Sequence, residues 1–515
     1  MITYARPHLR RWPSENNLFI LACLLCSLPV WLPHFPPMVD LPQHAAQISL
    51  LLNIGNAEFP FSEEFQLNLF TPYLIGYALI MSVIPLFGIV AASKLVIWLA
   101  LASFSFSTRF LLRHTGGDPY WAWLTFPVLY GFTYQWGFLN FLIAAPVGIL
   151  FLGYVWKKRD KCDLRSSLLI VLMLYVLFFS HALIMALFSL IAVTYWSYTT
   201  KRWRDFVRCA WPMITLAPLV VAWLFLVSNN PQVSRSIVWD LSWINSSILY
   251  PASWIDPEKQ GFGRVAGFLP RLLGERPNIY VTLLGIMLFA LPFLAGGHIT
   301  KTRIRLMPMF FITSLLLFFP SYFFGVAFIY QRYTQLALPL FLIMIDTQKN
   351  NLRVQRYLRI LAPVIAFGWI AYMSMCALQF NKDSKGFETV LSNMEPHKRA
   401  KSLIFLREDS HSIAPTFVHF PAWYSAINIG ITNPSFARYY QLPVVYKAGY
   451  SIGGLGSEFT PHKFDWKADE GYKYDYFVVR SPEDFGAYIF RTATCGIELV
   501  IHSGEWWLYR RDPQC

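Results

Sequence analysis

Long apolar stretches separated by short polar connectors make up most of the chain before residue 379. Stretches such as 70–90, 307–328 and 360–378 contain no charged side chain. Each is close to the ~20 residues that an α-helix needs to cross about 30 Å of hydrocarbon, where all backbone hydrogen bonds are made within the segment. The pattern predicts a polytopic α-helical membrane protein with about twelve apolar segments, near 18–33, 69–91, 94–113, 119–136, 139–156, 166–180, 182–199, 209–228, 277–296, 306–328, 334–347 and 357–378.

The positive charges are concentrated in the connectors. Only 14% of the residues are charged, yet the formal net charge is +14. An excess of Lys and Arg is typical of cytoplasmic loops of membrane proteins, so the charge does not call for a nucleic-acid partner, and we expect none. The N-terminus and all the basic connectors are predicted to be cytoplasmic, at 6–11, 157–165, 201–208, 301–305 and 349–359.

The last basic connector also predicts where the tail lies. One further apolar segment follows it, so the tail is expected on the outer side, which requires an odd number of crossings. The sequence therefore predicts about eleven transmembrane helices, and we expect the early segment 69–91 not to span fully.

Charge and turn-forming residues return from Gln379 onward. Runs rich in β-branched and aromatic residues predict strands at 402–406, 476–479, 498–501 and 506–509. A turn signal at 502–505 predicts that the last two form a hairpin. The sequence thus divides into a transmembrane helical bundle at 1–378, with outer loops at 34–68 and 229–276, and a small soluble extracytoplasmic α/β domain at 379–515.

The cysteines have no spacing typical of a metal site. Cys23, Cys26 and Cys376 lie in apolar segments and are predicted to be packing residues. Cys495 and Cys515 flank the predicted terminal hairpin, and we expect them to pair in an oxidising compartment.

The first outer loop contains a candidate acid–base pair, Asp40 and His44, in the run Asp40-Leu41-Pro42-Gln43-His44. Asp40 followed by Pro42 is typical of a helix N-terminus, so a purely structural capping role is one interpretation. The other is that the two side chains, one helical turn apart, lie on one face. Such a pair can deprotonate a hydroxyl or help to hold a divalent cation.

A second candidate, Arg332, lies in a short outer turn between two apolar segments. A guanidinium at a membrane boundary suits a phosphate ligand, although an arginine there can also extend to the headgroups. His181, between two other apolar segments, is predicted to be a hydrogen-bonded hairpin residue and not a ligand.

The outer loop 229–276 combines aromatic rings with charged side chains. Aromatic faces beside carboxylates suit a sugar, but tryptophans at a membrane interface give the same pattern. The candidate substrate-binding residues of this loop are Trp239, Asp240, Trp254, Asp256, Arg264 and Arg271.

These features together resemble the GT-C class of polytopic glycosyltransferases, which use polyprenyl-phosphate-linked sugars. The resemblance rests on a first apolar helix followed at once by the loop with Asp40, on the late outer Arg332, and on the outer tail. The tail segments 474–479 and 504–509 look similar to strands in bacterial members. The chain departs from better-defined members because no acidic pair stands beside Asp40, while Glu63-Glu64 comes later in that loop.

The resemblance implies transfer of a sugar from a polyprenyl phosphate or diphosphate to an acceptor at the outer face of a bacterial inner membrane, for the cell envelope. Asp40 would be the general base, which implies inversion in a direct displacement. Arg332, with Arg264 or Arg271, would stabilise the leaving phosphate, and His44 would orient Asp40 or join a cation site. We expect Asp40 and Arg332 to share one outer cavity, with an apolar groove for the lipid. The partners of the protein would be the membrane lipid bilayer and the lipid-linked sugar donor.

A transporter or another lipid-handling membrane protein without catalysis is the alternative. Ion pathways need charged side chains within the membrane helices. Few are present here, and Lys94 and Asp346 lie near the ends of their segments. This scarcity favours an enzyme.

Overall fold

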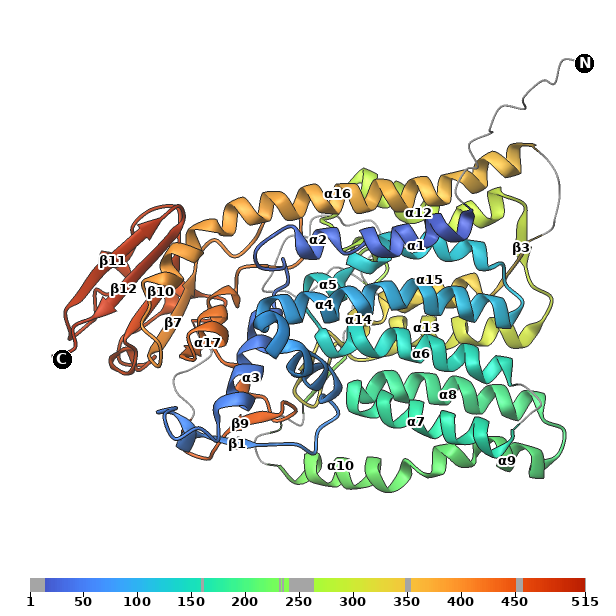
Figure 1. The fold of residues 1–515 in the computed structure, drawn as a ribbon, viewed down its shortest axis with the longest axis horizontal. Helices are drawn as coiled ribbons and strands as arrows, with labels where there is room; N and C mark the ends of the chain where they lie inside the picture. Colours follow the sequence, from blue (N-terminus) through green and yellow to red (C-terminus); the bar gives the residue numbers. More distant parts are fainter. Residues whose placement is uncertain are drawn as a thin grey trace, which may run out of the picture.

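The computed structural model describes residues 14–158, 162–230, 233, 236–239, 264–347, 353–450 and 457–514. Its helices run along the long axis of the molecule, and the C-terminal strands lie at one end (Figure 1). The principal helices are α1 (Glu15–Leu25), α4 (Ile75–Thr115), α6 (Leu139–Lys157), α7 (Leu164–Ser180), α8 (Ala182–Thr199), α9 (Trp203–Ile214), α10 (Ala217–Asn229), α12 (Ile279–Leu294), α13 (Met307–Phe318), α15 (Thr334–Leu342) and α16 (Arg353–Ser392).

Several helices have the length and composition to cross a bilayer. Among the described residues these are α4, α6, α8 and α16, and α9 with α10, bent by 43°, can count as a fifth. Three shorter apolar helices accompany them, at Glu15–Trp31, Leu164–Ser180 and Ile279–Leu294. The chain is therefore a polytopic membrane protein, while the number of its crossings stays a prediction.

Three predicted segments take a different form from a simple span. The segments 69–91 and 94–113 are joined in α4, which is interrupted at Gly88, where φ is 71°. The segment 119–136 forms 3-10 turns at Pro119–Thr125 and Pro127–Tyr130, then α5 (Phe132–Gln135), because prolines lack the N–H that a continuous α-helix needs.

The segment 334–347 forms only the nine-residue helix α15, which is followed by strand β6 (Ile345–Thr347). All nine residues of α15 are buried. Non-helical backbone at membrane depth is tolerated where protein surrounds it.

The tail contains a five-stranded sheet with the order β11-β12-β10-β7-β8. Strand β7 (Arg399–Ile404) is parallel to β10 (Tyr476–Arg480) and to β8 (Ile431–Asn433). Strands β11 (Ile497–Ser503) and β12 (Trp506–Arg511) form the predicted hairpin.

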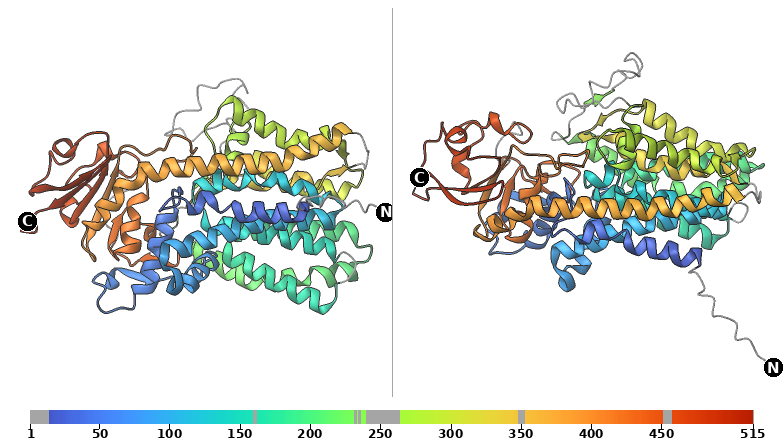
Figure 2. Two further views of the ribbon diagram at one scale, coloured as in Figure 1. Left: turned by 45° about the horizontal axis from the view of Figure 1, so that its top comes forward. Right: turned by 90° about the horizontal axis from the view of Figure 1, so that it is seen from above.

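Helix α16 joins this sheet to the bundle without a break. It continues past residue 379, where the sequence predicts the domain boundary, and ends at Ser392 (Figure 2). Its side chain Phe387 packs against Trp506 of β12, with ring centroids 5.0 Å apart. The predicted boundary thus falls within a helix that both parts share.

The first outer loop docks onto the tail through helix α3 (Leu41–Asn53). Gln43 Nε2 donates to Pro434 O at 2.7 Å, and its Oε1 accepts from Phe436 N at 3.0 Å. Gln47, one turn later, accepts from Val444 N at 3.1 Å. Strand β1 (Phe65–Leu67) then pairs antiparallel with β9 (Val444–Tyr446).

The predicted outer loop 34–68 and the basic connector 301–305 lie at opposite ends of the bundle. Helix α3 and strand β1 of this loop lie beside the tail, whereas β3 (Gly297–Ile299), next to the connector, lies at the far end (Figure 1). The side that faces the cytoplasm stays a prediction.

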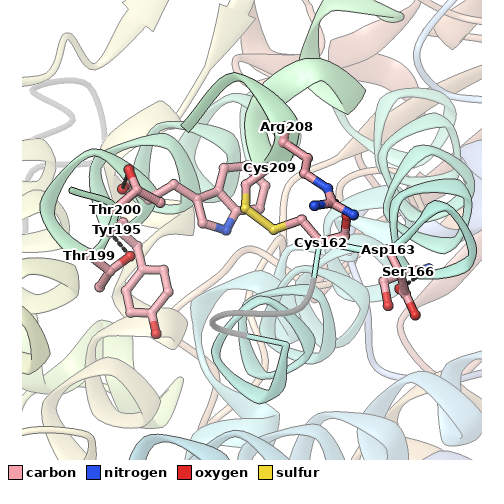
Figure 3. Close-up of a disulfide and its surroundings, with 9 residues drawn as sticks. Cys162, Asp163, Ser166, Tyr195, Thr199, Thr200, Arg208 and Cys209 are labelled. Atoms are coloured by element: carbon pink, nitrogen blue, oxygen red, sulfur yellow. Dashed lines mark hydrogen bonds between the residues drawn. A yellow bond between two sulfur atoms is a disulfide. The ribbon is translucent and has the colours of Figure 1, made fainter. Parts of the chain in front are cut away.

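A disulfide that the sequence analysis did not anticipate links Cys162 to Cys209 at the far end from the tail (Figure 3). Their Cα atoms are 5.2 Å apart, and the bond ties the start of α7 to the amphipathic helix α9. Cys23, Cys26 and Cys376 are free. Cys515, the predicted partner of Cys495, lies outside the described residues.

We expect Cys162 and Cys209 to form a disulfide in the purified protein and to be reduced in intact cells. The positive-inside pattern predicts that this disulfide lies in the cytoplasm, where thiols are kept reduced. Acid-quenched cells treated with a maleimide mass tag should show both thiols labelled, with Cys162→Ser as the reference for one fewer tag. A pair that is oxidised in living cells would contradict the predicted orientation.

Candidate active site

A cavity of about 370 Å³ lies where the bundle meets the tail. Its walls come from α3, the starts of α4 and α6, the hairpin of β4 (Tyr322–Phe323) and β5 (Val326–Ala327), helix α14 (Ile329–Arg332), and the tail loops around 419, 436–442 and 458. Most of the lining is apolar or aromatic, so the few charged groups in it are conspicuous. They are Asp40, Arg332, His419 and Glu458.

Asp40 is placed by a close approach of two backbone segments. Its N–H donates to Trp136 O at 3.0 Å, and the chain then turns at Gly137, where φ is +75°. A Cβ atom at Gly137 would lie 2.9 Å from Asp40 N, so only glycine fits both the backbone conformation and the contact. Asp40 occupies the N-cap position of α3, yet its side chain makes no capping hydrogen bond.

The carboxylate of Asp40 is instead bound by an imidazole from the tail. His419 Nδ1 donates to Asp40 Oδ1 at 2.9 Å, and Nε2 donates to Glu458 Oε1 at 2.7 Å. Burial lowers the pKa of His419, but the hydrogen bonds and charges of the two carboxylates outweigh burial and raise this pKa to about 9. His419 is therefore an imidazolium at neutral pH, and it compensates one of the two carboxylates.

Arg332 faces the same cavity without forming an ion pair among the described residues. Its Nη2 donates to Ala327 O at 3.0 Å, and its guanidinium carbon lies 3.7 Å from the centre of the Phe138 ring. Its Nε has no hydrogen-bond partner, and no carboxylate of the described residues forms an ion pair with it. A guanidinium in such a setting favours an anionic ligand.

His44 also lines the cavity, but it does not contact the Asp40 carboxylate. Its Nδ1 forms a 2.7 Å hydrogen bond with the Tyr77 hydroxyl. Burial lowers the pKa of His44 to about 4, although nearby Asp40 opposes this effect. His44 is thus neutral at pH 7, and the imidazole that holds Asp40 in the structure is His419.

The other predicted binding residues lie elsewhere. Arg264 and Arg271 are buried over the ring of Tyr330, at 3.9 and 5.4 Å, and do not line the cavity. Trp239 is 57% exposed, follows strand β2 (Ile237–Val238) and is not among the residues that line the cavity. Three candidates of the same loop lie outside the described residues: Asp240, Trp254 and Asp256.

One prediction is wrong in its hydrogen bonding. His181 is predicted to be a hydrogen-bonded hairpin residue, but it lines the cavity, and neither ring nitrogen has a hydrogen-bond partner among the described residues. Across the ranges that the structure describes, no three His, Cys, Asp or Glu side chains are grouped to hold a metal ion.

Sequence reasoning missed His419 and Glu458. His419 is 379 residues from Asp40, and it lies in an aromatic run, 417–424, that is typical of a packed core. The one available signal was a histidine within an aromatic run of the tail, because a histidine that is buried there needs a hydrogen-bond partner.

The fold is similar to that of ArnT, a glycosyltransferase of the GT-C class that the sequence resembles. The particular structures it is similar to are two of ArnT from Cupriavidus metallidurans. The one bound to undecaprenyl phosphate is 12% identical with a TM-score of 0.55, and the apo one is 13% identical with a TM-score of 0.54. Both comparisons cover 96% of this chain and 97% of the other. No protein-family model and no curated protein matches the sequence.

Proposed function

We propose that the protein transfers a sugar from a polyprenyl-phosphate donor to a hydroxyl acceptor at the outer face of the membrane. The observation that carries this proposal is that a carboxylate, Asp40, and a guanidinium without an ion-pair partner among the described residues, Arg332, line one cavity. A transferase needs a base for the acceptor and a cation for the leaving phosphate within one enclosed space. The fold supports the donor class, because ArnT of the same fold was solved with undecaprenyl phosphate.

In the proposed reaction, Asp40 takes the proton of the acceptor hydroxyl as the hydroxyl oxygen attacks the anomeric carbon. The bond between that carbon and the donor phosphate oxygen breaks, and the polyprenyl phosphate leaves with the electron pair. A single displacement inverts the anomeric centre. Asp40 thereby gains the proton, and Arg332 stabilises the charge that develops on the phosphate.

His419 binds Asp40 directly, and Glu458 binds the other nitrogen of His419. An imidazolium that donates to both carboxylates fixes the orientation of Asp40 and keeps two neighbouring negative charges compatible in a buried site. We assign His419 and Glu458 a positioning role, because both act through Asp40.

The aromatic wall beside Arg332 suits the first isoprene units of the donor. Phe328 lies 4.4 Å from Trp136 and 5.7 Å from Phe132, measured between ring centroids. Phe138 lies within this cluster and also beneath the guanidinium of Arg332. An apolar chain attached to a phosphate can therefore contact rings while its charge reaches Arg332.

Arg332→Gln is expected to weaken binding of undecaprenyl phosphate by roughly 10- to 100-fold, because glutamine keeps a hydrogen-bond donor but removes the charge that pairs with the phosphate. Native mass spectrometry of the protein in detergent or nanodiscs measures this affinity. Undecaprenol, which lacks the phosphate, should bind both forms equally weakly.

Arg510→Gln is the matched control, because Arg510 is exposed in the tail and pairs with Glu498. It should bind undecaprenyl phosphate like the wild type. Equal affinities of wild type and Arg332→Gln for the phosphorylated lipid would contradict the assigned donor site.

A further inference from the structure

His181 is a fully buried histidine whose hydrogen-bonding capacity is unused. Its side chain is 1% exposed and lines the cavity, and both ring nitrogens lack a partner among the described residues. A buried polar group without a partner is costly, and native proteins rarely retain one without a reason.

The backbone around His181 fixes its direction. Its N–H donates to Leu177 O at the end of α7, at 2.8 Å. Its carbonyl accepts from Ile184 N and Met185 N in the first turn of α8, both at 3.1 Å. The ring is held between Tyr73 and Phe141, each with its centroid 5.3 Å away. Neighbouring side chains thus enclose the imidazole but provide no hydrogen bond.

Two other polar side chains of the same cavity each have one atom without a hydrogen bond among the described residues. These atoms are Arg332 Nε and the amide oxygen of Asn140, in the first turn of α6, whose side chain also interacts with the Tyr77 hydroxyl. Helix α8 begins directly after His181, so the positive end of its dipole also lies at this position. A cation, an uncharged donor–acceptor ring and a side-chain amide therefore line one cavity whose other walls are largely apolar.

We infer that His181, together with Arg332 and Asn140, forms the subsite for the glycosyl-phosphate head of the donor. A neutral imidazole presents one N–H donor and one acceptor nitrogen. The N–H donates to a phosphate oxygen beside Arg332, and the second nitrogen accepts from a hydroxyl of the sugar. This inference rests on the proposed function and extends it. It makes His181 a specificity-determining residue that binds both the phosphate and the sugar of the donor.

His181→Phe separates this role from a structural one, since it keeps the ring shape and removes both polar atoms. We expect it to weaken undecaprenyl phosphate binding by roughly 10-fold or more, while the Tm of the lipid-free protein stays unchanged or rises, because an unsatisfied buried group is lost. His181→Gln restores a donor and an acceptor and should recover part of the affinity. His462→Phe, at an exposed histidine of the tail, is the control and should change neither quantity.

The opposite result would overturn the inference. If His181→Phe lowers the Tm and leaves the affinity for undecaprenyl phosphate unchanged, His181 is a structural residue, and the proposed function stands on Asp40 and Arg332 alone. If the wild-type protein does not bind undecaprenyl phosphate at all, the proposed function and this subsite both fail.

Discussion

Asp40→Asn is expected to lower the rate of sugar transfer by roughly 10²- to 10⁴-fold, the usual contribution of a general base. Asparagine keeps the size of the side chain and can still accept from His419, so the protein should remain folded and inserted. What it loses is the ability to take the acceptor proton. The measurement is transfer of radiolabelled sugar from a panel of polyprenyl-phosphate donors in proteoliposomes.

Asp163→Asn provides a matched control at the other end of the bundle. Asp163 caps α7 by accepting from Ser166 N at 3.0 Å, and asparagine caps equally well. The control should retain wild-type transfer, and both variants should show the wild-type elution volume and Tm. If Asp40→Asn retained full transfer with every active donor, Asp40 would not be the base.

Raising the pH through about 9 is expected to disrupt the site and loosen the docking of the tail. The pKa of His419 is raised from an ordinary value of 6.5 to about 9. The folded state therefore binds this proton more tightly than the unfolded state. The stabilisation is fully present below pH 6.5, declines above it, and is lost as the pH rises through 9. It amounts to roughly 3 kcal/mol of unfolding free energy.

Two profiles test this expectation: Tm against pH and kcat/KM against pH, both between pH 6 and 10. Glu458→Gln removes one of the carboxylates that raise the pKa of His419, so the midpoint of both profiles should move to lower pH. Glu498→Gln, at an exposed glutamate of the tail hairpin, is the control and should leave the midpoints in place. Midpoints that do not differ between Glu458→Gln and the wild type would contradict the assigned coupling of His419 to Glu458.

The membrane class and the terminal hairpin could be predicted because both follow from local patterns. An apolar run of about 20 residues and an alternation of β-branched and aromatic residues have the same physical meaning in almost any context. The interruptions of the helices were less predictable. Helix α4 is interrupted at Gly88, whose positive φ is a conformation open to glycine. The buried segment 119–136 forms 3-10 turns, because its backbone can be satisfied by neighbouring protein that a hydropathy pattern does not describe.

Asp40, His44 and Arg332 could be selected from the sequence because each is a polar residue at the predicted outer edge of an apolar segment. That they line one cavity follows from the packing of α3, α6 and α14. The loop residues Arg264 and Arg271 carry the same kind of signal, yet they pack on Tyr330. Residue type and topology thus indicate candidate residues. Neither shows whether an arginine lines the cavity or is buried against an aromatic ring.

By itself the sequence determined that the chain is a membrane protein with a strand-rich tail. It also indicated Asp40 and Arg332 as candidate active-site residues. These conclusions were possible because hydropathy and residue type can be evaluated over short stretches of chain. Only the tertiary structure decided what Asp40 is bonded to and which polar groups remain free. His419 bridges Asp40 and Glu458 and thereby joins the loop 34–68 to the tail. The lack of hydrogen-bond partners for the His181 ring nitrogens among the described residues is seen only once its neighbours are in place. Hydrogen bonds and burial between distant segments depend on how the whole chain packs, and no local pattern encodes them.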